Sequence, residues 1–188
     1  MDRANPKFSA PESEILRALE TALKNADVAQ QVDRIVAEAE RKLARNTGEA
    51  MAWEVIPLSL YGESLPDGIQ SSWVFVIRAR AVTGAERHPN SIQRAMSYRR
   101  SGDLQVREDG VWRSNLLVSD PDADLEQKWV SIPVNVWHQV VVGDRDWVVV
   151  SFHTVPEDQL IEERHDPADP NSTRRRRYLE RAGSSGGL

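Results

Sequence analysis

The stretch that decides the fold runs from Ser131 to Thr154: Ser-Ile-Pro-Val-Asn-Val-Trp-His-Gln-Val-Val-Val-Gly-Asp-Arg-Asp-Trp-Val-Val-Val-Ser-Phe-His-Thr. Pro133 fixes its own φ, and Asn135 tolerates the left-handed conformation that many tight turns require. The valines that follow His138 are β-branched and typical of strands, and Gly143-Asp144 is typical of a hairpin turn. The stretch therefore predicts a tight turn, a strand that begins at His138, and a valine-rich return strand.

The composition predicts one domain of ordinary size with extensions. The chain has 188 residues, 40% of them hydrophobic and 28% charged, which is enough for a core and a polar surface. Its net charge of −5 argues against nucleic acid as a partner. The absence of cysteine excludes disulfides and thiolate metal sites. Because the sequence shows neither a membrane-length apolar run nor the apolar core of a signal peptide, we expect a cytoplasmic protein.

The hydrophobic periodicity divides the chain into three parts. Residues 1–48 carry two helical stripes, which predict an N-terminal helical pair that packs on the next part or, alternatively, mediates contact with a partner. Residues 49–164 contain short alternating segments with turn signals, which predict an all-β sandwich, barrel or jelly roll and a last short helix over 156–164. Residues 165–188 are rich in Asp, Pro, Arg, Gly and Ser, and we expect a disordered tail.

The predicted strands are short and closely spaced. Apart from the stretch quoted above, they are expected around residues 53–61, 72–81, 93–98, 102–107, 111–117 and 128–132. The first of them contains a proline and is therefore expected at a sheet edge or a bulge.

A family resemblance rests on Pro133-x-Asn135-x-x-His138. This pattern resembles the second motif of the cupin superfamily, in which a Pro-x-Gly turn is followed three residues later by a metal-binding histidine. Asn135 stands where the family usually has Gly, and both residue types reach positive φ. The resemblance covers roughly residues 50–160. It implies a mainly β fold, the cupin-like double-stranded β-helix or jelly roll, with a ligand site in its mouth and with homodimers common.

The first cupin motif, typically Gly, His-x-His, Glu and Gly, has a divergent counterpart in residues 83–103. In one register His88 and Asn90 replace the histidine pair, and the Glu position falls on Ala95. In the other register Glu86 and His88 form the pair, and Gln93 takes the Glu position. We prefer the second register because it supplies a polar side chain at every expected position.

The resemblance thus implies a metal-binding set, which is Glu86, His88, Gln93 and His138. Imidazole nitrogen and oxygen donors suit divalent Fe, Mn, Ni or Zn, and two imidazoles with one carboxylate resemble the facial arrangement of non-haem iron sites. The alternative is that the same residues bind no metal. They would then line a pocket that hydrogen-bonds a polar small molecule, or they would satisfy one another in the barrel mouth.

Four further residues are predicted to contact the small-molecule ligand, and these are Asn90, Arg94, Tyr98 and Trp137. An arginine can hold a carboxylate through its two-pronged guanidinium, and aromatic side chains can wall an apolar cavity. Trp73 and Trp147 are considered as further wall residues, with core packing as their alternative role.

Two functions remain open at this point. The first is a metal-dependent enzyme of the oxygenase, isomerase or decarboxylase type that the resemblance implies. The second is a metal-free, non-catalytic ligand-binding or sensing module that engages a protein partner.

Overall fold

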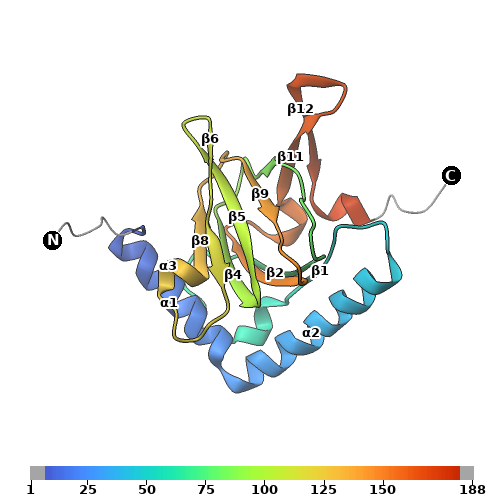
Figure 1. The fold of residues 1–188 in the computed structure, drawn as a ribbon. Helices are drawn as coiled ribbons and strands as arrows, with labels where there is room; N and C mark the ends of the chain where they lie inside the picture. The colour runs from blue at the N-terminus through green and yellow to red at the C-terminus, as the bar shows by residue number, and fades with distance from the viewer. Residues whose placement is uncertain (1–6, 183–188) are drawn as a thin grey trace.

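The computed structural model describes residues 7–182, and it consists of two antiparallel sheets with a helical pair against one of them (Figure 1). The elements are α1 (Ala10–Lys24), α2 (Ala26–Arg45), β1 (Met51–Val55), η1 (Leu58–Tyr61), β2 (Ser71–Ile77), β3 (Glu86–Arg87), β4 (Gln93–Arg99), β5 (Ser101–Glu108), β6 (Val111–Arg113), β7 (Leu116–Val118), α3 (Leu125–Lys128), β8 (Trp129–Ile132), β9 (His138–Val141), β10 (Trp147–His153), η2 (Glu157–Gln159), β11 (Ile161–Asp166), β12 (Asp169–Arg177) and η3 (Leu179–Ala182).

The chain crosses repeatedly from one sheet to the other, which is the defining feature of a jelly roll. The helix-side sheet has the strand order β1-β2-β10-β4-β8. The site-side sheet has the order β12-β11-β3-β9-β5-β6, with β7 also paired to β5. All of these pairs are antiparallel. The predicted fold class, a mainly β, cupin-like jelly roll with an N-terminal helical pair, is confirmed.

The predicted hairpin around Gly143-Asp144 is wrong, although both of its strands exist. β9 pairs with β5 and β3 in the site-side sheet, whereas β10 pairs with β2 and β4 in the helix-side sheet. All seven residues of β10 are buried, so this strand needs a neighbour on each side and a packed layer on each face. The turn therefore carries the chain from one sheet to the other.

The helical pair covers the outer face of the helix-side sheet (Figure 1). Ser9 caps α1 by accepting from the backbone N–H of Glu12, and Asn25 caps α2 by accepting from the N–H groups of Asp27 and Val28. The apolar stripes of both helices form one core with the outward residues of the sheet. This core includes Leu16, Leu19, Val32, Val36, Val148, Val150 and Phe152.

A second core lies between the two sheets. It contains the inward residues of the alternating strands, among them Trp73, Phe75, Ala95, Leu104, Trp147 and Val149. Trp73 and Trp147 are fully buried, and the Trp147 indole N–H donates to Ser97 Oγ at 2.8 Å. Both tryptophans therefore have the core-packing role.

The end of the chain differs from its prediction. The segment 165–182, expected to be disordered, forms the end of β11, the strand β12 and the helix η3, and the β11–β12 hairpin projects from the body (Figure 1). Arg174 pairs with Asp166 across this hairpin, and Tyr178 is 1% exposed against the inner core. Composition predicted disorder because it does not reveal these long-range partners. Residues 183–188 of the predicted tail lie outside the described residues.

Two local predictions also fail near prolines. β1 ends at Val55, and the rest of the strand predicted over 53–61 is a 3-10 helix that begins after Pro57. The helix predicted over 156–164 is confined to Glu157–Gln159, after which β11 begins. In each case the proline limits the backbone geometry at the start of a short turn.

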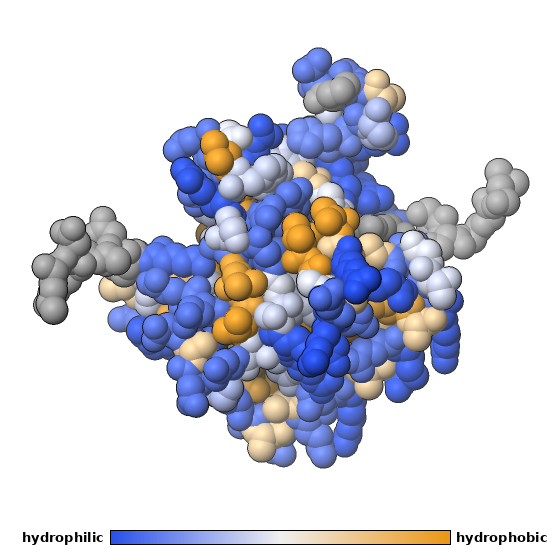
Figure 2. Space-filling model, viewed as in Figure 1, coloured by the Kyte–Doolittle hydropathy of each residue, from blue (hydrophilic) through white to orange (hydrophobic). Residues whose placement is uncertain are grey.

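The surface of the molecule is mostly hydrophilic on the face in Figure 2, with hydrophobic residues in small groups. The large hydrophobic side chains that are exposed include Val82, Val111, Leu116 and Val134. Among residues 7–182, no helix is long and apolar enough to cross a membrane.

Candidate metal centre

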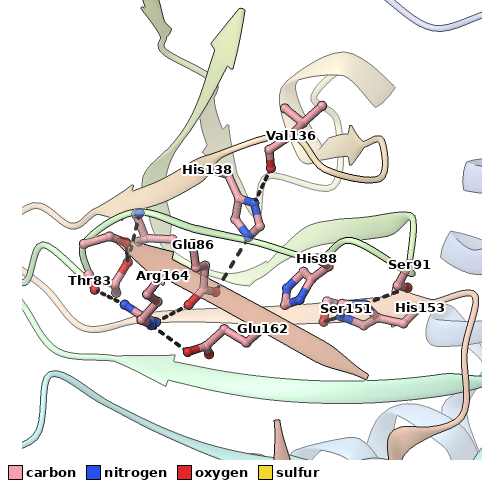
Figure 3. A network of polar contacts seen from close by, with 12 residues as sticks. Thr83, Glu86, His88, Ser91, Val136, His138, Ser151, His153, Glu162 and Arg164 are labelled. Atoms are coloured by element: carbon pink, nitrogen blue, oxygen red, sulfur yellow. Dashed lines mark hydrogen bonds and ion pairs between the residues drawn. The ribbon is translucent and has the colours of Figure 1, made fainter. Parts of the chain in front are cut away.

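Two short strands bring the central residues together. Glu86 lies on β3 directly opposite His138 on β9, and His88 follows two positions after Glu86. One donor atom from each of these three side chains lies within 4.8 Å of the others. Figure 3 shows both imidazoles and the carboxylate converging in the space between the strands. The structure therefore places three of the four predicted metal-binding residues in one cluster.

The turn before β9 fixes one side of the cluster. Asn135 adopts φ 63°, as its residue type predicted, and its N–H donates to the backbone oxygen of His88 at 3.0 Å. The same turn supplies the carbonyl of Val136, which lies 3.2 Å from His138 Nδ1. The segment that carries one imidazole is thus attached to the segment that carries the other.

Backbone carbonyls determine which nitrogen of each imidazole carries hydrogen. His138 Nδ1 contacts the oxygen of Val136, and His88 Nδ1 contacts the oxygen of Ile161 at 2.8 Å. Because a carbonyl oxygen can only accept, both Nδ1 atoms must be donors. In a neutral ring, Nε2 then keeps its lone pair. Second contacts of this kind orient histidines that bind metals.

The Nε2 atom of His138 is buried and has no hydrogen-bond partner among residues 7–182. It lies 3.6 Å from Glu86 Oε1, too far for a good hydrogen bond. A buried imidazole nitrogen that faces a carboxylate oxygen across this gap is an arrangement that a proton or a metal cation would satisfy.

Arg164 holds the other oxygen of the Glu86 carboxylate. Its Nη2 forms an ion pair with Glu86 Oε2, its Nη1 donates to the Thr83 oxygen at 2.9 Å, and its Nε donates to Glu162 Oε1 at 2.7 Å (Figure 3). Arg176 also contacts Glu162 Oε1 at 2.7 Å. The arginine therefore leaves Glu86 Oε1 as the oxygen directed toward the imidazoles.

The surroundings favour the protonation states that a metal needs. Burial alone would raise the pKa of Glu86, but its interactions with His138 and with the Arg164 charge outweigh burial and lower this pKa. Burial, with a smaller contribution from His138, lowers the pKa of His88. At neutral pH the carboxylate is therefore charged and the His88 imidazole neutral, and both are competent ligands.

His153 is a third buried imidazole beside the cluster that the sequence did not assign to the site. Its ring centroid lies 5.2 Å from that of His88, at an interplanar angle of 88°. Its Nδ1 lies 3.2 Å from Ser91 Oγ and its Nε2 lies 3.3 Å from Ser151 Oγ. Because hydroxyls occupy both nitrogens, His153 supports His88 by packing. The sequence signal that could have assigned His153 to the site was its inward position in the alternation of β10.

A small cavity lies against the cluster, with a volume of about 30 Å³. Its polar lining comes from Thr83, Glu86, Gln93 and His138, and its apolar lining comes from Met51, Phe75, Ile77, Leu104, Val140 and Val149. Gln93 is 7% exposed, and its Oε1 has no hydrogen-bond partner within the described chain. The fourth predicted metal-binding residue therefore lines the cavity next to the cluster.

The residues predicted to contact a ligand lie elsewhere. On β4, Gln93 points between the sheets, so the alternation of a strand directs Arg94 and Tyr98 to the opposite face. Arg94 pairs with Glu12 on α1, and the Tyr98 hydroxyl donates to Asp33 on α2 at 2.8 Å.

Asn90 and Trp137 are also outside the cavity lining. The Asn90 side chain donates to the Gln159 oxygen at 2.7 Å and accepts from the Ile161 N–H at 3.1 Å, which fixes the chain before β11. The Trp137 ring stacks on His165 with centroids 4.1 Å apart. In the structure both residues make contacts within the chain.

Arg164 and Glu162 are the important residues that sequence reasoning missed. Both lie in the segment predicted as a helix, where side chains two apart do not share a face. The segment Glu162–Asp166 is polar at every position, so no alternation of polar and apolar residues indicated a strand there.

The strand order and the position of the His-His-Glu cluster between the sheets define a jelly-roll protein with a candidate metal centre. Neither family models nor curated proteins match the chain.

Similar solved structures include an oxalate oxidase in complex with the substrate analogue glycolate, with 13% identity, a TM-score of 0.43, and coverage of 56% of this chain and 51% of that chain. The capsular polysaccharide assembling protein CapF from Staphylococcus aureus has 15% identity, a TM-score of 0.44, and coverage of 67% and 32%. Recombinant pro-11S globulin of pumpkin has 18% identity, a TM-score of 0.45, and coverage of 60% and 27%. The chain spans about half the length of the oxalate oxidase and about a third of CapF. The assignment of the fold rests on the strand order.

Proposed function

We propose that this protein binds a divalent transition metal through Glu86, His88 and His138 and acts as a metal-dependent enzyme on a small molecule in the adjacent cavity. The observation that carries the proposal is the buried, unpartnered Nε2 of His138, directed at Glu86 Oε1 within a cluster whose donor atoms lie within 4.8 Å of one another.

A cation explains this arrangement better than an ordinary polar cluster does. The fixed Nδ1 hydrogens leave lone pairs on both Nε2 atoms, and Glu86 Oε1 adds a third acceptor. Of these atoms, His138 Nε2 is buried and has no hydrogen-bond partner among residues 7–182, which is unfavourable by about 1–3 kcal/mol. A metal ion would satisfy all three at once.

The donor set narrows the choice of metal. Two imidazole nitrogens and one carboxylate oxygen suit Fe, Mn, Ni or Zn, and this combination with open positions is the facial triad of non-haem iron oxygenases. When bound, such a metal supplies Lewis-acid or redox chemistry to a molecule beside it. An oxygenase, isomerase or decarboxylase reaction is part of the proposal.

The chain itself supplies orientation and an apolar wall. Arg164 directs the Glu86 carboxylate, and the backbone contacts of His88 and His138 direct the two rings. Gln93 presents an amide to the cavity, and side chains such as Phe75 and Leu104 form its apolar wall.

Element analysis of protein purified without a histidine tag tests this function. We expect close to one transition metal per chain, lost in His88→Ala and His138→Ala variants that remain folded by circular dichroism. His165→Ala is the matched control, because this exposed histidine stacks on Trp137 away from the cluster, and it should retain the metal. Protein without metal, with a thermal stability that chelator leaves unchanged, would instead support the metal-free binding or sensing module.

A further inference from the structure

We infer that the cavity beside the metal centre accepts a small monoanion of two or three non-hydrogen atoms, held by uncompensated positive charge and by the Gln93 amide. This inference rests on the proposed function, because the charge comes from the bound metal. Three observations lead to it, namely the paired charges around Glu86, the size of the cavity and the unpartnered amide oxygen of Gln93.

The charges around the cluster already cancel before any metal is added. Glu86 pairs with Arg164, and Glu162 pairs with both Arg164 and Arg176, so two negative and two positive groups sum to zero. Metal binding requires both imidazole rings in their neutral form, so His88 and His138 as ligands add no charge to this sum. A divalent metal would therefore bring two positive charges into a buried region with nothing on the protein to offset them.

An anion is the simplest way to offset part of that charge. In a site with one free carboxylate, the carboxylate itself removes one positive charge from the metal. Here Arg164 has already neutralised Glu86, so the full charge remains. Burying uncompensated charge is strongly unfavourable, and the metal-loaded site should favour an anionic ligand over a neutral one.

The size of the cavity limits that ligand. Its volume is about 30 Å³, and its lining comes from side chains of both sheets, including Phe75 and Leu104. A single water needs about 10–15 Å³ by this measure, so roughly two or three non-hydrogen atoms fit. Azide and nitrite satisfy this limit, whereas benzoate does not.

Gln93 provides the directional contact. Its side chain is buried, lines the cavity, and leaves Oε1 without a partner within residues 7–182. An amide group can turn to present either its oxygen or its NH₂, and only the NH₂ can donate to an anion. The backbone of Gln93 is fixed by pairing with Ile132 and His153 on its two neighbouring strands.

The experiment uses the full chain loaded with Co²⁺, whose visible absorption reports on ligands beside the metal. Titration with azide or nitrite should change the spectrum saturably, whereas benzoate at the same concentrations should leave it unchanged. Equal responses to azide and benzoate would overturn the size argument.

Two variants separate the contributions. Arg164→Met should bind Co²⁺ about tenfold more tightly, because the substitution frees the Glu86 carboxylate. The same variant should bind azide at least about tenfold more weakly, because it lacks a nearby positive charge. Gln93→Leu should bind azide about tenfold more weakly and retain Co²⁺, as expected for loss of one hydrogen bond to a charged group. Arg87→Met is the matched control, because Arg87 pairs with Glu163 and faces away from the cluster, and it should change neither affinity.

The outcomes are distinguishable. If Co²⁺ is retained and azide leaves the spectrum unchanged, the inference is overturned while the proposed function stands. If the wild-type chain does not retain Co²⁺, both are overturned. If Arg164→Met weakens both affinities, the arginine has only a structural role and the charge argument is wrong. If Gln93→Leu loses Co²⁺ while folded, Gln93 binds the metal and not the anion.

Discussion

Arg94 offers a decisive test of the structure, because the sequence predicted that it contacts a ligand and the structure places it in an ion pair. Its Nε donates to Glu12 Oε1 at 2.7 Å and its Nη2 donates to Oε2 at 2.9 Å. The two side chains are 7% and 20% exposed. This bidentate ion pair connects α1 to β4. The variant that tests it is Arg94→Met, which keeps the apolar part of the side chain and removes the charge.

The geometry sets the expected loss of stability. Removing one partner of a fully buried ion pair costs about 3–5 kcal/mol, and the residual exposure of Glu12 reduces this to about 2–3 kcal/mol. With a urea m-value of about 2.5 kcal/mol/M, the unfolding midpoint should fall by about 1 M. Arg99→Met is the matched control on the same strand. Its pair with Asp33 is 40% and 49% exposed, so the loss should be below about 1 kcal/mol.

The pH dependence supplies a second signature of the same pair. Burial would raise the pKa of Glu12, but its hydrogen bonds from Arg94 and Ser131 outweigh burial and lower this pKa. A lowered folded-state pKa stabilises the protein above the unfolded value of about 4.3 and loses that effect as the pH falls below it. The difference in stability between wild type and Arg94→Met should therefore narrow from pH 5 to pH 3. An Arg94→Met variant that unfolds like wild type but no longer binds ligand would refute this reasoning.

Two further predictions concern packing. Gly102→Ala should lower the free energy of unfolding in a urea titration by about 3 kcal/mol or more, because a Cβ there would lie 2.2 Å from Trp147 Cε3. Gly143→Ala is the control and should have little effect in the same titration, because there is open space around Gly143 in the described chain. Tyr178→Ala should cost about 3–5 kcal/mol because this ring packs against Trp73 in the inner core, and the exposed neighbour Arg177→Ala should change stability by less than about 0.5 kcal/mol. Equal thermal unfolding of Tyr178→Ala and wild type would instead support the disordered tail that composition predicted.

Local patterns predicted the parts of the fold that depend on neighbouring residues. The helical stripes, the alternation along Gln93–Arg99 and the valine-rich Trp147–His153 all correspond to observed elements. Asn135 reaches positive φ as its residue type suggested, and His138 begins its strand. These features follow from side-chain periodicity and turn chemistry, which a single sequence contains.

Pairing between distant segments was not accessible in the same way. The sequence around Gly143 predicts that the strand after it pairs with the strand before it. In the structure this second strand is buried on both faces and pairs with β2 and β4 of the helix-side sheet instead. Arg94 was assigned to the ligand because nothing in its neighbourhood reveals Glu12, which lies 82 residues earlier. Charged side chains on strands are ambiguous for this reason, since their partners determine whether they bind a ligand or fasten an element.

In the candidate site, too, some residues could be predicted from local sequence and others depend on distant segments, and this difference affects the chemistry of the site. Glu86 and His88 were grouped by the register of the resembled first motif and His138 by its turn, and the structure brings these three side chains together. Arg164 comes from a strand that composition concealed, and it changes the charge of the site from that of a carboxylate to that of a neutral ion pair. Under the proposed function a metal there would keep its full charge, and we therefore expect the arginine to influence which molecules the site binds, although it is not itself a donor. The ligand set alone therefore underdetermines the function of such a centre, and the partner of its carboxylate must be known as well.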